Sequence, residues 1–83
     1  MFGYTLANAA SAQVFNKAAN YIVNQLHFKP TEKALEDVDG SIIQCFRDGN
    51  DSIELSIDEQ IGGVFVCSTR KLNIQCVREW ETN

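Results

Sequence analysis

Three cysteines and one histidine, Cys45, Cys67, Cys76 and His27, are the residues best suited to metal or thiol chemistry. The cysteines lie far apart and form no CxxC pair, whereas a structural zinc site takes four ligands in close pairs. An odd number of thiols without a secretion signal predicts free, mostly buried cysteines in a reducing compartment. We therefore predict no metal site and no cofactor.

Two similar pentapeptides, IQCFR at 43–47 and IQCVR at 74–78, raise the question of a duplicated unit. Their flanks differ, because DGNDS follows the first and EWETN follows the second. A true duplication shows similarity along the whole repeat. We interpret the match as convergence, since any half-buried strand alternates apolar and polar residues in this way.

Motifs for common enzymatic chemistry are missing from the sequence. It contains no phosphate-binding glycine loop, no G-x-S-x-G nucleophile elbow and no H-E-x-x-H zinc motif. Basic residues are few and scattered, and aromatic residues do not alternate with them. We predict that the chain is not an enzyme and does not contact nucleic acid phosphates directly.

Charge is distributed unevenly along the 83 residues. The chain has 11 acidic and 7 basic residues, and nine of the acids fall within residues 32–59. Such a segment repels phosphates and attracts basic partners, although the alternative is a solvated surface that only keeps the chain soluble. We predict a partner-binding surface made of Glu32, Glu36, Asp37, Asp39, Asp48, Asp51, Asp58, Glu59 and the apolar Phe46.

The N-terminal half of the chain has helical periodicity. Phe15, Ile22 and Leu26 follow helical spacing and predict a helix over about 8–27, capped by Asn8 or Ser11. Thr31 after Pro30, followed by acidic residues, predicts a short second helix over about 32–37. An edge strand is the alternative for this second segment.

The rest of the chain changes to a period of two residues. Alternation predicts strands at about 41–47, 52–57, 63–68 and 72–79, with RDGND as the first hairpin turn. Short loops favour a sequential antiparallel sheet. We therefore predict a single α+β domain, residues 1–83, with the long helix packed on one face of a four-stranded antiparallel sheet.

These observations favour a small, acidic, non-catalytic protein that acts by contact with another protein. A helix covers only one face of the predicted sheet, so apolar side chains remain for a partner with a basic surface or for a homodimer. An inhibitor or antagonist is typical of this size and charge, either toxin-neutralising or of the viral and mobile-element anti-defence type. The alternatives are a structural homo-oligomer, a nucleic-acid mimic and a small thiol-dependent enzyme.

The expected location is the cytoplasm. No apolar run is long enough to span a bilayer, so we predict no membrane contact. The N-terminal residues lack a basic region followed by a hydrophobic stretch, so we predict no signal peptide.

Overall fold

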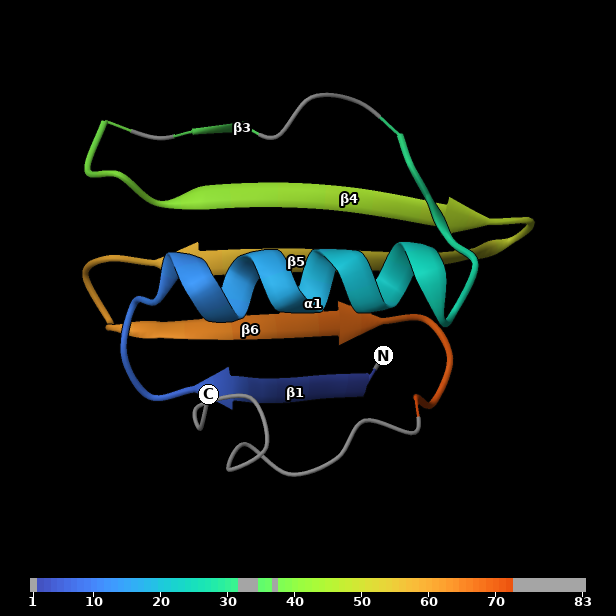
Figure 1. The fold of residues 1–83 in the computed structure, drawn as a ribbon, viewed down its shortest axis with the longest axis horizontal. Helices are drawn as coiled ribbons and strands as arrows, with labels where there is room; N and C mark the ends of the chain where they lie inside the picture. The colour runs from blue at the N-terminus through green and yellow to red at the C-terminus, as the bar shows by residue number, and fades with distance from the viewer. Residues whose placement is uncertain (1, 32–34, 37, 73–83) are drawn as a thin grey trace.

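The described part of the chain forms an antiparallel sheet, and one helix lies over one face of it and runs along the strands (Figure 1). The computed structural model describes residues 2–31, 35–36 and 38–72. Within them, the elements in chain order are β1 (Phe2–Ala7), α1 (Ala12–Asn24), β2 (Lys29–Pro30), β3 (Leu35–Glu36), β4 (Ile42–Asp48), β5 (Asp51–Asp58) and β6 (Gly63–Ser68).

Among the described residues the sheet has six strands, and their order in the sheet differs from their order along the chain. The order is β1-β6-β5-β4, and the short strands β2 and β3 both pair with the outer edge of β4. β4, β5 and β6 form two successive hairpins, whose turns contain Gly49 and Gly62 with φ of 63° and 82°. A positive φ of this size costs glycine little, which allows these tight connections.

The ends of α1 are set by residues that flank it directly in the sequence. The Ser11 hydroxyl oxygen accepts a hydrogen bond from the Val14 N–H at 3.2 Å and caps the first turn. After the helix, His27 adopts a left-handed φ of 63°, and the Phe28 N–H then donates to the Ile22 carbonyl at 3.1 Å. This turn directs Phe28 back into the core, where its side chain is 1% exposed.

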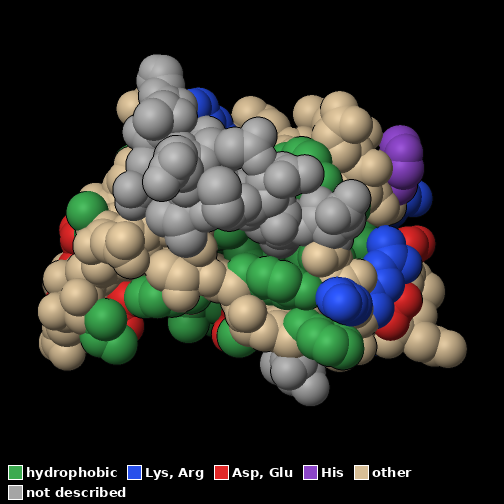
Figure 2. All heavy atoms as spheres, turned by 90° about the horizontal axis from the view of Figure 1, so that it is seen from below, with side chains coloured by type: hydrophobic (Ala, Val, Ile, Leu, Met, Phe, Trp, Pro, Cys, Tyr) green, Lys and Arg blue, Asp and Glu red, His purple; other side chains and the backbone are tan. Residues whose placement is uncertain are grey.

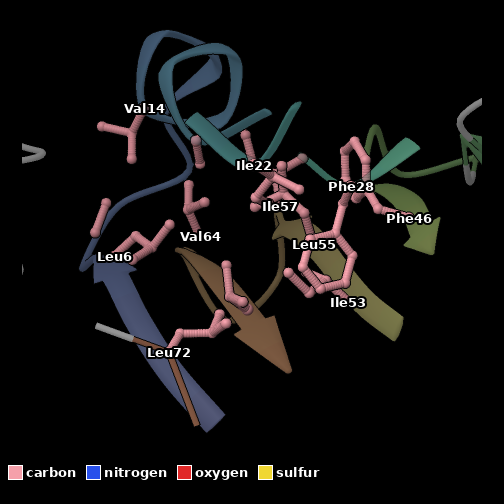
Figure 3. Packing of buried hydrophobic residues seen from close by; sticks show 13 residues of the cluster. Leu6, Val14, Ile22, Phe28, Phe46, Ile53, Leu55, Ile57, Val64 and Leu72 are labelled. Carbon is pink, nitrogen blue, oxygen red and sulfur yellow. The ribbon is translucent and has the colours of Figure 1, made fainter. Parts of the chain in front are cut away.

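The core lies between α1 and one face of the sheet (Figure 3). Helix residues one turn apart point toward alternate residues of β5, which are themselves 0–5% exposed. The described core comprises Leu6, Ala7, Val14, Ala18, Ile22, Phe28, Phe46, Ile53, Leu55, Ile57, Val64, Val66 and Leu72.

The structure contradicts the predicted α+β fold of two helices and a four-stranded sheet. The described chain is mostly β, with six strands and a single helix of 13 residues in place of the predicted helix over 8–27. β4, β5 and β6 begin and end within one residue of the strands predicted at 41–47, 52–57 and 63–68. The predicted strand at 72–79 falls almost wholly outside the described residues.

The predicted second helix is wrong because backbone pairing with β4 overrides the local capping signal. Thr31, expected to cap that helix, donates its N–H to the Cys45 carbonyl at 3.0 Å instead. Pro30 lies in β2 on the edge of the sheet, where a missing N–H costs no ladder hydrogen bond. Leu35 and Glu36 form β3, which corresponds to the edge-strand alternative.

Strand β1 was not predicted from the sequence. Leu6 and Ala7 are buried, and Phe2, Tyr4 and Leu6 alternate with Gly3 and Thr5, which is a period-two pattern. The prediction did not use this short run, and the register with β6 also shifts between Thr5 and Ala7. Its place in the sheet comes from pairing with β6, more than 50 residues further along the chain.

Candidate functional site

The sheet face opposite α1 is covered by no element of the described chain, and we call it the uncovered face. Side chains alternate along a strand, so residues that flank the buried positions of β4, β5 and β6 point to this face. A Cβ built on Gly3, at the β1 end of this side, meets nothing within 4 Å. The uncovered face carries Ile43, Cys45, Arg47, Ser52, Glu54, Ser56, Asp58, Phe65 and Cys67.

Two rows of side chains cross the uncovered face from strand to strand. Strand pairing places Leu35, Ile43, Ser56 and Phe65 in one row, here called the apolar row. Leu35 is 63% exposed and Ile43 is 38% exposed, whereas the Phe65 ring lies over Gly63. Hydrophobic side chains also reach the surface along the lower side of Figure 2, which looks onto the β1 edge of the molecule.

The second row, here called the thiol row, comprises Cys45, Glu54 and Cys67. Both thiols are half-buried, where the sequence predicted mostly buried ones. They flank Glu54 on strands two positions apart, so their Cα atoms are about 10 Å from each other, beyond the roughly 7 Å limit for a disulfide. Among the described residues, no group of three or more His, Cys, Asp or Glu side chains could hold a metal ion.

Three carboxylates line one hollow that runs from the centre of the uncovered face to one of its ends. A hollow of about 310 Å³ is lined by Asp39, Glu54 and Asp58 together with hydroxyl and amide groups, and we call it the acidic hollow. Within the part of the chain that the structure describes, none of these carboxylates forms an ion pair. The full lining is Asp39, Ser41, Ile43, Glu54, Ser56, Ile57, Asp58 and Gln60.

Backbone hydrogen bonds fix the two carboxylates that come from turns. Asp39 accepts the Ser41 N–H at 2.9 Å, and this bond, followed by one from the Ser41 hydroxyl, lowers the pKa of Asp39 below its ordinary 3.8. Asp58 accepts the N–H groups of Gln60 at 3.0 Å and Ile61 at 2.9 Å. Both carboxylates are thus held in place at the rim of the sheet.

The opposite end of the uncovered face is basic. Lys29 pairs with Arg47 across β2 and β4, so their side chains lie on the same side of the sheet. Both side chains are exposed, and within the described residues neither forms an ion pair. A second hollow, of about 330 Å³, lies beside Arg47 and the thiol row.

Asp48 and Asp51 belong to a different environment from the acidic hollow. They flank the β4–β5 turn, where Arg70 approaches their carboxylates at 3.6 Å and 3.3 Å and lies 4.6 Å from the centre of the Phe28 ring. Figure 2 shows Lys and Arg side chains beside Asp and Glu at the right-hand end of the molecule. A nearby cation therefore offsets part of the charge of these two acids.

The predicted binding residues consequently do not form one surface. Asp39 and Asp58 line the acidic hollow, and Glu59 adjoins it with its side chain 3.3 Å from a Cβ built on Gly40. Phe46 is 2% exposed and packs in the core. Glu36 is exposed on β3, Asp48 and Asp51 lie at the far end, and Glu32 and Asp37 fall outside the described residues.

The prediction also omitted residues that this face brings together. Glu54 is exposed at the centre of the face, and its position could have been read from the alternation of β5. Lys29 could not have been found in this way, because its place beside Arg47 depends on pairing between segments distant in sequence.

Comparisons of this chain with protein-family models, with curated proteins and with solved structures find no match. Among the described residues, no helix has the length and apolar character needed to cross a bilayer.

Proposed function

We propose that this protein is a small non-catalytic binding protein whose uncovered face contacts a second protein with a basic surface. The observation that carries the proposal is the acidic hollow, with Asp39, Glu54 and Asp58, beside exposed Leu35 and Ile43. Carboxylates that form no ion pair within the described residues favour a partner that supplies a cation, and the adjacent apolar side chains gain from being covered.

The arrangement suits recognition of protonated side chains. An Arg or Lys entering the acidic hollow finds carboxylates along its lining, while the neighbouring hydroxyls of Ser41 and Ser56 accept further hydrogen bonds. Apolar groups beside that cation can pack on Ile43. A partner that needs its basic surface for its own activity would be blocked by such a contact, which makes an inhibitor or antagonist the proposed role.

A charge reversal at Glu54 tests this proposal. Glu54→Lys places a cation in the acidic hollow without disturbing either turn, since Glu54 is an exposed strand residue. The matched control is Asn16→Lys with Asn20→Lys, which adds the same charge to the exposed side of α1. Each protein is immobilised and used to capture partners from a lysate of the organism that encodes it and of any host.

The expected result is one protein retained by the wild type and by the helix control but not by Glu54→Lys. Calorimetry with that purified protein should then give an affinity for Glu54→Lys at least roughly tenfold weaker than for the wild type. Equal retention by Glu54→Lys and the wild type would show that the acidic hollow does not bind the partner. Failure of the wild type to retain any protein would contradict binding as the function.

A further inference from the structure

The two ends of the uncovered face carry opposite charges along the strand direction. Arg47 is paired with Lys29 on one side and with Ser52 on the other, which defines the basic end. Asp58 lies at the other end of β5 from Ser52, a distance of about 20 Å at roughly 3.4 Å per residue. A second copy turned end for end would therefore offer the opposite charge at each end.

We propose that two copies of this chain pair through their uncovered faces, with the strands of the two sheets antiparallel. The two-fold axis lies between the faces, perpendicular to the strands, over the cross-strand pair of Gln44 and Leu55. Ser52 and Asp58 lie equally far from Leu55 along β5, and Arg47 is level with Ser52. The axis therefore places the basic end of each copy over the acidic hollow of the other.

The two central rows also fit each other under this axis. The apolar row and the thiol row lie on either side of the Gln44–Leu55 level, so each row of one copy faces the other row of its partner. Glu54 then faces the Ser56 hydroxyl, and Ile43 and Phe65 face thiols. A carboxylate gains a hydrogen-bond donor, and half-buried apolar groups meet weakly polar sulfur.

A two-fold axis parallel to the strands does not give the same fit. With that axis over β5, Asp58 of one copy would face Asp58 of the other, and Glu54 would face Glu54. Like charges placed opposite each other in an interface are costly and exclude that arrangement. The charges thus select one of the two ways in which a sheet can pack on its own copy.

The molecule is large enough for its broad side to form an interface of ordinary size. Its two longer extents, 32 Å and 28 Å, bound a rectangle of about 900 Å², which is an upper limit for that side, against roughly 800 Å² per partner in a standard interface. Sheets that pack face to face leave about 10 Å for interdigitating side chains. This spacing accommodates Arg47 and the acidic hollow without burying a charge alone.

This pairing goes beyond the proposed function and does not rest on it. The second copy uses the face assigned above to a basic partner, so such a partner would bind by displacing one copy. Self-association is measured on the purified protein alone, whereas the proposed function is measured by capture of another protein. A negative result in one experiment therefore contradicts one proposal and leaves the other unaffected.

Charge exchange between the two ends tests the geometry. The variants are Arg47→Glu at the basic end and Asp39→Lys in the acidic hollow, with Asn16→Glu and Asn20→Glu together on α1 as a control that matches the charge change of Arg47→Glu. Sedimentation velocity at roughly 10–500 µM measures the mass of each variant and of an equimolar mixture of the first two. Circular dichroism checks folding, and Gln60→Lys, also in the acidic hollow, replaces Asp39→Lys if that variant is unfolded.

The wild type and the helix control should sediment at twice the 9.3 kDa of one chain. Each interface variant should weaken self-association at least tenfold, because every change occurs twice in a symmetric pair. The mixture should recover the dimer, since opposite charges then meet at both ends. A wild type that stays monomeric, an Arg47→Glu dimer as stable as the wild type, or a mixture that stays dissociated would each overturn the proposal.

Discussion

Phe46 lies in the core of this sheet, and its removal gives the most direct test of the described packing. Its side chain is 2% exposed and belongs to the cluster that includes Phe28 and Ile53 (Figure 3). A buried phenylalanine removes about 150–250 Å² from water, which corresponds to about 4–6 kcal/mol at ~25 cal/mol per Å². Because Phe-to-Ala changes in cores cost about 3–5 kcal/mol, we expect Phe46→Ala to lower the free energy of unfolding by that amount.

This loss is large compared with the total stability of the chain. At about 0.05–0.15 kcal/mol per residue, a chain of 83 residues unfolds with a free energy of about 4–12 kcal/mol. The midpoint of thermal unfolding should fall by about 4–8 °C for each kcal/mol lost. The assay is urea denaturation followed by circular dichroism at one low protein concentration, so that self-association contributes equally to every variant.

The matched control for Phe46→Ala is Ile61→Ala. Ile61 is 75% exposed, so its truncation should change the free energy of unfolding by less than about 0.5 kcal/mol. If Phe46→Ala does not fold, Phe46→Leu retains most of the volume and should cost about 1 kcal/mol. A Phe46→Ala protein within about 1 kcal/mol of the wild type, at an unchanged denaturant slope, would refute the core assignment.

Two further predictions concern the acidic hollow and the β1–β6 edge. NMR titration of Asp39 should give a midpoint below 3.8, and Ser41→Ala should raise it only partly, because the stronger backbone donor remains. The stability that Asp39 contributes is therefore present above its unfolded-state pKa and lost as the pH falls through its lower folded-state pKa; a midpoint at or above 3.8 would contradict the hydrogen bond. Gly63→Ala should cost about 1–3 kcal/mol in urea denaturation, since the new Cβ would lie 2.5 Å from the Phe65 ring. Gly3→Ala, whose Cβ meets nothing within 4 Å, should be neutral or slightly stabilising, and equal losses for both variants would count against the described packing.

The central strands could be located from the sequence because their signal is local. Ile53, Leu55 and Ile57 alternate with polar residues, so one face of this segment is apolar whatever surrounds it. Helical spacing located α1 in the same way, although its length was overestimated because Ser11 caps it and His27 adopts a left-handed conformation. Each end of α1 depends on one residue, and other polar residues close by in the sequence could have ended the helix equally well.

The edges of the sheet could not be predicted, because a short edge strand exists only when it pairs. Leu35 and Glu36 carry no alternation of their own, and their extended form depends on hydrogen bonding to β4. β1 differs, because Phe2, Tyr4 and Leu6 alternate with Gly3 and Thr5 and so carry a strand signal, and only its pairing with β6 required the structure. Local capping signals were therefore the strongest available evidence for residues 32–37, and they indicated the wrong element.

The sequence by itself determined the composition of the candidate site, namely an excess of carboxylates over basic groups. Only the tertiary structure decided which carboxylates act together. Asp39, Glu54 and Asp58 line one hollow because β4 and β5 pair in a fixed antiparallel register, whereas Asp48 and Asp51 lie at the far end beside Arg70. Charge is a property of each residue, but its position on a surface depends on contacts between segments that are distant along the chain.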